Sequence, residues 1–259
     1  MQIIFTLYRS RKTASNIQNV KPMSWNAILG IACIVSFLLP VAVILYNRYY
    51  THRSLAALLA YYTLIFIDNL FAENIIPMDD RISKFISILD NFCDVPLMLT
   101  VLLFFCPDRK KQNSIRLLTY AFIAYEIAII AIIGFNTSAV TYVLGPGIVL
   151  VLGYASYLFV RQVKFSIYHS KNHGRMIMLS SIFFVYATYA LIYFFHYLQK
   201  TPYINDVMML YYIASILSAV VMAIGLHLIR RRLKELQSVQ VTRKELAVFF
   251  GHKSGIETR

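Results

Sequence analysis

The stretch "FISILDNFCDVPLMLTVLLFFC", residues 85–106, is an apolar run that carries two aspartates, Asp90 and Asp94. About 20 mostly apolar residues are enough for a helix to cross the hydrocarbon core of a bilayer. A charge in the middle of such a helix costs at least about 2.5–3.5 kcal/mol, so it usually faces the interior of a bundle and needs a partner. The stretch therefore predicts one span of a membrane protein with several spans.

The composition of the whole chain agrees with this prediction. Of its 259 residues, 59% are hydrophobic and only 14% are charged, whereas a soluble domain carries about 25% charged residues. Mean hydropathy is +0.62. The three cysteines lie within apolar runs or at their ends, which is typical of buried thiols and not of a disulfide framework or a zinc site. These features predict an integral membrane protein.

Seven apolar runs of membrane-spanning length follow one another with short connections. They cover residues 25–46, 54–74, 85–106, 115–135, 139–160, 176–198 and 207–229. The fold class that they predict is all-α, an integral membrane bundle of seven transmembrane helices at residues 25–229. A basic N-terminal segment, 1–24, precedes the bundle, and a basic tail, 230–259, follows it.

The distribution of Lys and Arg predicts the orientation of this bundle. One set of loops holds ten of them: Arg48, Arg53, Arg109, Lys110, Lys111, Arg116, Arg161, Lys164, Lys171 and Arg175. The opposite loops hold three, Arg81, Lys84 and Lys200, and the tail adds eight to the richer side. Positive residues stay cytoplasmic, so the N-terminus is expected outside and the C-terminus inside, although the four basic residues of segment 1–24 disagree.

The net charge of +13 then has a simple interpretation. It fits attraction to anionic lipid headgroups at the cytoplasmic face of a plasma (inner) membrane. The basic tail is also a candidate contact for a cytoplasmic partner. No nucleic-acid recognition motif accompanies it, so no nucleic-acid partner is expected.

Five carboxylates fall within the predicted spans: Asp68, Glu73, Asp90, Asp94 and Glu126. No Lys or Arg lies in the interior of a span, so these groups are expected to be protonated, hydrogen-bonded to neutral groups, or holding a cation. At 1.5 Å per residue, Asp68 and Asp90 lie about 8–9 Å below the outer boundary, and Asp94 and Glu126 lie near the midplane. Because Asp90 and Asp94 are one helical turn apart and repel each other, the pair is predicted to share about one negative charge.

Tyrosines form the second candidate feature. The sixth span reads "FFVYATYALIYFFHYLQK", in which Tyr186, Tyr189, Tyr193 and His196 recur at steps of three and four and so share one helical face. Such a stripe suits a pocket wall whose hydroxyls face the carboxylates, while ordinary packing and an interfacial aromatic belt are the alternative. The candidate ligand- or cation-binding residues are therefore Asp68, Asp90, Asp94, Glu126, Tyr186, Tyr189, Tyr193 and His196. Neither catalytic residues nor a metal site are predicted, since no known catalytic or metal-binding motif occurs.

The segment "LDNFCDVPLML", residues 89–99, resembles the third helix of the microbial (type 1) rhodopsins. That helix carries an Asp, a hydroxyl residue four positions later, and Pro-Leu-Leu or Pro-Leu-Met two residues further on. Asp90 would occupy the counter-ion position, Asp94 would replace the usual threonine, and Pro96 would open the final triplet. The segment "GLHLIRRR", residues 225–232, resembles the exit of the family's seventh helix.

The sequence departs from this family where the chromophore binds. The resemblance implies a retinal-binding lysine near Val221, yet span 207–229 contains no lysine, so covalent retinal is excluded there. Leu217 stands near the family's seventh-helix aspartate, and Val101 stands at its proton-donor position. A light-driven pump is therefore not expected, and no cofactor is predicted, although a non-covalent apolar ligand stays possible.

Three classes of function fit these features. The first is a receptor or sensor that binds a small ligand or cation at an intramembrane carboxylate and tyrosine pocket. The second is a proton- or cation-coupled transporter that uses the buried carboxylates, although no inverted repeat is evident. The third is an intramembrane enzyme, which is the least favoured because the last span holds only His227 and no paired histidines. We expect the first class and keep the transporter as the alternative.

Overall fold

The computed structural model describes residues 25–73, 75–106, 108–169, 173–195 and 207–229, and this part of the chain contains helices and no β-strand. The predicted segments 1–24 and 230–259, and His196, lie outside the described residues. The long helices are α2 (Trp25–Tyr46), α3 (Arg53–Ala72), α4 (Asp80–Leu102), α5 (Arg109–Ile133), α6 (Thr137–His169) and α7 (His173–Tyr193), followed by a last helix, Val207–Ile229. Two short 3₁₀ helices, η1 (Tyr49–Thr51) and η2 (Leu103–Phe105), follow α2 and α4.

Seven helices in the described part are long and apolar enough to cross a membrane. This confirms the predicted all-α class and the seven spans of an integral membrane protein. Helix α2 ends at Tyr46, where the first predicted span ends, but α6 is 33 residues long and continues past the predicted end at residue 160. Residues 161–169 contain neither Gly nor Pro, so nothing in the backbone ends the helix where the apolar run ends.

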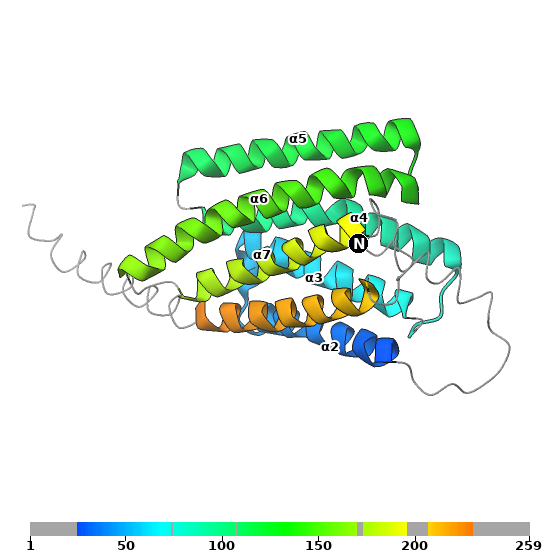
Figure 1. The fold of residues 1–259 in the computed structure, drawn as a ribbon, viewed down its shortest axis with the longest axis horizontal. Coiled ribbons are helices and arrows are strands. Elements are labelled where there is room, and N and C mark those ends of the chain that lie inside the picture. The colour runs from blue at the N-terminus through cyan, green and yellow to red at the C-terminus, as the bar shows by residue number, and fades with distance from the viewer. Residues whose placement is uncertain (1–24, 74, 107, 170–172, 196–206, 230–259) are drawn as a thin grey trace, which may run out of the picture.

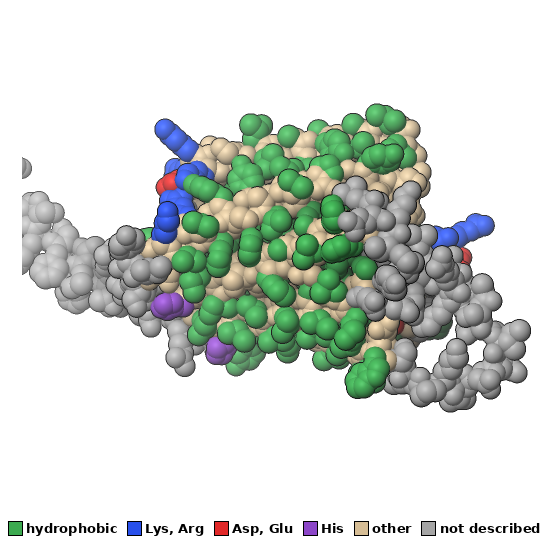
Figure 2. Space-filling view, viewed as in Figure 1, with side chains coloured by type: hydrophobic (Ala, Val, Ile, Leu, Met, Phe, Trp, Pro, Cys, Tyr) green, Lys and Arg blue, Asp and Glu red, His purple; other side chains and the backbone are tan. Residues whose placement is uncertain are grey.

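The helices lie side by side along the long axis of the molecule (Figure 1). On the face drawn in Figure 2, Lys and Arg gather at the two ends, and hydrophobic side chains cover the surface between them. Large apolar residues that are exposed include Leu117, Ile127 and Ile132 of α5. An apolar surface of this extent suits lipid and would drive a soluble protein to aggregate.

Helix α5 lies at the edge of the bundle (Figure 1). It packs against α4 and α6, whereas α4 also packs directly against α3 and α6. Only a few α5 side chains are buried, namely Ile115, Thr119, Phe122 and Glu126. Glu126 is therefore one of the few residues through which α5 faces the interior.

Helix α7 and the last helix cross at two small residues, Gly174 and Gly225. A Cβ built on Gly225 would lie 3.0 Å from the Gly174 carbonyl oxygen and 2.9 Å from the Met178 backbone nitrogen. Two turns further along, the Ser181 hydroxyl donates to the Ser218 carbonyl oxygen at 2.7 Å. Small residues let helix backbones approach closely, and hydroxyl contacts then join them, so this contact holds α7 and its tyrosines in place.

Candidate functional site

A hydrogen bond between α4 and α7 forms the centre of the candidate site. The Tyr186 hydroxyl donates to Asp94 Oδ1 at 2.7 Å. Tyr186 is 0% exposed, and Asp94 is half-buried. Tyr61 of α3 lies within hydrogen-bonding reach of Tyr186 and close to the Asp94 carboxyl. Three helices therefore meet at this carboxyl group.

The four predicted carboxylates form a series across α3, α4 and α5. Asp68, Asp90 and Glu126 are only 2%, 8% and 5% exposed. The carboxyls of Asp68 and Asp94 are both close enough to that of Asp90 to repel it, and Asp94 repels Glu126 in the same way. The structure thus brings together residues that lie on three spans, as their depths in the sequence suggested.

Several acceptor atoms in this region have no hydrogen-bond partner among the described residues. They are Asp68 Oδ2, Asn69 Oδ1 and Glu126 Oε1, all buried. A buried polar atom without a partner costs about 1–3 kcal/mol. A proton on a carboxyl group, or a water or cation beside it, would remove that cost.

The carboxylates do not form a multidentate metal site. Within the described residues, no group of three or more His, Cys, Asp or Glu side chains converges in a way that could hold a metal ion. The acidic groups are near enough to repel one another but do not surround a common point. This arrangement is chemically suited to sharing protons.

The predicted tyrosine stripe separates in the structure. The Tyr189 hydroxyl lies 3.3 Å from Ser215 Oγ of the last helix, and the Tyr189 ring lies next to that of Tyr186, with centroids 5.7 Å apart. The Tyr193 hydroxyl instead donates to the Thr141 carbonyl oxygen of α6 at 3.4 Å. Tyr186 and Tyr189 therefore belong to the centre, and Tyr193 belongs to the contact with α6.

Sequence reasoning missed part of the tyrosine cluster. Tyr211 of the last helix stacks on Tyr189 with ring centroids 5.8 Å apart, and the next residue, Tyr212, donates a hydrogen bond to Glu73 Oε1. Glu73 ends α3 and lies against Gly30 of α2, where a Cβ would be 2.8 Å from the same oxygen. The sequence signal for this part of the cluster was the pair of adjacent tyrosines in the last span. Their partners lie on other helices, so the sequence alone did not reveal the contacts.

The space inside this cluster is very small. A cavity of about 10 Å³ lies among Tyr61, Tyr62, Tyr189 and Ser215. A volume of about 10–15 Å³ holds one water molecule. This cavity therefore has space for a water or a small ion, and none of the four predicted carboxylates lines it.

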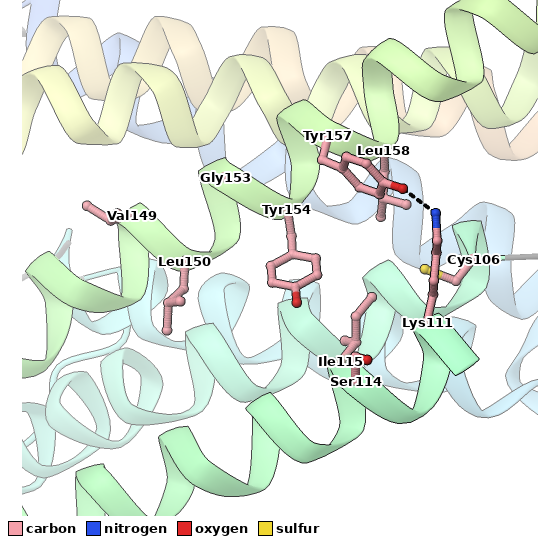
Figure 3. Close-up of a pocket in the computed structure, with 10 residues that line it drawn as sticks. All are labelled: Cys106, Lys111, Ser114, Ile115, Val149, Leu150, Gly153, Tyr154, Tyr157 and Leu158. Carbon is pink, nitrogen blue, oxygen red and sulfur yellow. Dashed lines mark hydrogen bonds between the residues drawn. The ribbon is translucent and has the colours of Figure 1, made fainter. Parts of the chain in front are cut away.

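A much larger hollow lies away from these residues, between α5 and α6 (Figure 3). It measures about 490 Å³. Lys111 donates to the Tyr157 hydroxyl at one end, and mostly apolar side chains line the rest, together with Gly153, Ser114 and Tyr154. None of the predicted site residues lines it, so this groove is separate from the carboxylate centre.

Comparisons of the chain with protein-family models, curated proteins and solved structures gave no match. The resemblance to the microbial rhodopsins therefore rests on the short motifs alone. In the structure, Leu217 is 48% exposed and Val221 is half-buried, whereas Ser218 and Met222 are buried. The positions that the resemblance assigns to the seventh-helix aspartate and lysine are thus not the most interior ones of the last helix.

Proposed function

We propose that this chain is a seven-helix membrane receptor or sensor, and that a proton or a small cation binds at the intramembrane centre formed by Asp68, Asp90, Asp94, Glu126 and Tyr186. The observation that carries the proposal is the Tyr186–Asp94 hydrogen bond within a series of buried, mutually repelling carboxylates. Two ionised carboxyls one turn apart, without a cation beside them, would cost several kcal/mol. The centre is therefore suited to holding protons.

The proposed ligand is smaller than the one that the sequence allowed. The sequence allowed a small organic ligand, but the cavity in the tyrosine cluster has the volume of about one water molecule. Among the described residues, Arg161 and Asp108 form an ion pair at 3.2 Å. This pair is exposed and lies away from the centre. A proton or a small cation is the ligand that needs the least rearrangement.

Binding at this centre can affect the rest of the bundle through α7. Asp94 lies on α4, and Tyr186 lies on α7, which also contacts the last helix through Gly174 and Ser181. Gain or loss of a proton at Asp94 changes the strength of its bond with Tyr186, because a bond to an ionised acceptor is stronger. A sensor would use that change to shift the position of α7 in the bundle.

The alternative is a proton- or cation-coupled transporter. The observation that favours it is the succession of carboxyls from Asp68 through Asp90 and Asp94 to Glu126, since chains of acidic groups act as proton relays in pumps and transporters. A transporter moves the ion across the membrane, and a sensor does not. Proton flux into proteoliposomes separates the two functions.

The test compares Asp94→Asn and Asp90→Asn with Asp108→Asn by infrared spectroscopy of the protonated carboxyl band over a pH series. The amide keeps the shape of the side chain, so all three variants should fold. We expect Asp94→Asn and Asp90→Asn to lose intensity in that band and to lose its change with pH. The exposed control, Asp108→Asn, should keep both. The Asp90→Asn, Asp94→Asn double variant should be at least as stable as the wild type, because the repulsion is gone.

Two outcomes would change the assignment. If neither single variant alters the band and the pH response survives in both, the carboxylates only hold the helices together. If proteoliposomes show a proton flux that Asp94→Asn abolishes, the transporter replaces the sensor. The plasma-membrane location, the cytoplasmic C-terminus and the remote kinship with the microbial rhodopsins stay predictions from the sequence.

A further inference from the structure

A third cavity lies at the end of the bundle where α3, α5 and α7 begin and α4 ends. Its volume is about 910 Å³, within the range of about 300–1,000 Å³ that is usual for small-molecule sites. Its lining includes His52 and Arg53 before and at the start of α3, Arg116 of α5, and Arg175 of α7. Residues from three separate helices therefore place basic groups around one hollow.

The described lining of this cavity is basic and contains no carboxylate. Arg53 and Arg116 are exposed, and Arg175 is half-buried. The Arg175 guanidinium lies over the Phe104 ring at 4.8 Å from the centroid, and the His52 ring meets the same phenyl ring edge-on at 5.3 Å. Phe104 thus fixes two of the basic groups relative to each other.

The field in this cavity is positive. Burial and, after it, the positive charge of Arg175 lower the pKa of His52 from its ordinary value of 6.5. His52 is therefore neutral at pH 7, and the guanidinium groups carry the charge. An anion in the cavity would meet these fixed positive charges without an acidic competitor in the described lining.

Apolar side chains also line the cavity. Pro96, Leu97 and Ile123 line it, and they lie about two turns deeper in the bundle than Phe104 and Arg116. The cavity therefore combines a basic mouth with an apolar interior. This combination fits an anion that carries an apolar part, as basic pockets between membrane helices do for lipid headgroups.

We propose that this cavity binds a phosphate-bearing anion, whose phosphate group is held by the guanidinium groups of Arg53, Arg116 and Arg175. Arginine suits this task because its planar fork of donors matches phosphate oxygens. The phosphate belongs either to an anionic lipid headgroup or to a water-soluble compound. The site shares no residue with the carboxylate centre, so the proposal stands independently of the proposed function.

The test uses the full chain in nanodiscs of phosphatidylcholine, with phosphatidic acid added to the bilayer in one arm and inorganic phosphate added to the buffer in the other. Binding is read from the NMR titration of His52, assigned with a His52→Asn variant. A bound phosphate favours the protonated imidazole and raises the pKa of His52. The other titratable or charged groups of the lining are Arg53, Cys106, Arg116, Tyr120 and Arg175.

The control is a second arginine of the same helix. Arg116→Gln removes a charge from the lining, whereas Arg109→Gln removes the same charge from α5 outside it. We expect Arg116→Gln to weaken binding about tenfold or more, since hydrogen bonds to charged groups are the strong ones, and Arg109→Gln to have little effect. Because Arg116 is exposed, its replacement should not disturb folding.

Each outcome decides the proposal. A rise in the pKa of His52 with phosphatidic acid alone identifies a lipid headgroup site, and a rise in both arms identifies a site for phosphate in general. The proposal is overturned if neither arm moves the titration. It is also overturned if Arg109→Gln weakens binding as much as Arg116→Gln, because the effect is then diffuse surface charge.

Discussion

At Asp94 a single phenolic hydroxyl joins two helices inside an apolar bundle. The Tyr186 hydroxyl provides the hydrogen bond, and its ring is completely buried, so the two parts of this side chain do different things. The ring fills space, and the hydroxyl gives the Asp94 carboxyl a hydrogen-bond donor. A hydrogen bond of this kind has a modest net value, about 0.5–1.5 kcal/mol, although leaving a buried acceptor without one costs more.

Tyr186→Phe separates these contributions. The variant should fold, because the phenyl ring keeps the packing, and it should lose about 1–3 kcal/mol of stability, because the Asp94 oxygen is left without its donor. The infrared band of the protonated carboxyls should shift. Tyr193→Phe is the control, since that hydroxyl bonds to a carbonyl of α6. Identical spectra for Tyr186→Phe and Tyr193→Phe would show that the hydrogen bond to Asp94 does not influence the protonated carboxyls.

Sequence reasoning reached the residues of the centre and not their partners. Asp94 and Asp90 were identified because carboxylates stand out in an apolar run, and that signal is local. The partner of Asp94 is 92 residues away, and periodicity alone does not say which neighbour a helical face meets. For this reason Tyr186 and Tyr193, although on one stripe, bond to different helices, and Tyr211 and Tyr212 were missed.

Among the helices, the contact between α7 and the last helix depends on the absence of two side chains. The backbones approach so closely at Gly174 and Gly225 that a methyl group on either one would lie within 3.0 Å of the other's carbonyl oxygen. Backbone atoms cannot move aside as the end of a flexible side chain can. The helices would have to separate, and the Ser181–Ser218 hydrogen bond would separate with them.

Gly225→Ala should therefore destabilise the bundle by about 1–3 kcal/mol, as overpacking of a close contact does. The matched control is Gly153→Ala in α6, where a Cβ would meet nothing within 4 Å. That variant should be neutral or slightly stabilising, because alanine favours a helix by up to about 1 kcal/mol over glycine. Thermal unfolding in detergent measures both. Equal midpoints for the two variants would contradict the close contact.

Element bounds were predictable wherever apolarity ended together with the helix. Helix α2 ends at Tyr46, where the predicted span 25–46 ends, because a turn follows at once. Helix α6 exceeds its apolar run because polar residues such as Arg161 and Lys164 continue a helix as well as apolar ones do. Hydropathy reports where the lipid ends, and the backbone can remain helical beyond that point.

For the whole molecule, the seven spans form one bundle, and the described Lys and Arg residues lie at its ends. Arg161, Lys164 and Arg175 mark the end where α6 stops and α7 starts, and Arg81 and Lys84 mark the end where α4 starts. The bundle defines two ends but not which end is cytoplasmic. The predicted assignment rests on the excess of Lys and Arg at the first end.

A protease-cleavable tag placed after Arg259 tests this assignment. In intact cells the tag should be protected, since the positive excess predicts a cytoplasmic C-terminus, and it should become accessible when the membrane is permeabilised. A tag in segment 196–206, which contains Lys200, should show the reverse pattern. Cleavage of the C-terminal tag in intact cells would invert the topology and would place the phosphate cavity at the outer surface.

The distance along the chain between Asp94 and Tyr186 has a consequence during synthesis. At about 5–20 residues per second, a ribosome needs about 5–20 s to add the 92 residues that separate them. Throughout that interval the third span is already made, and its carboxyl lacks the hydroxyl that meets it in the finished protein. Its entry into the bilayer must therefore be driven by its own leucines, valines and phenylalanines, and the translocon must accept Asp94 before the sixth span exists.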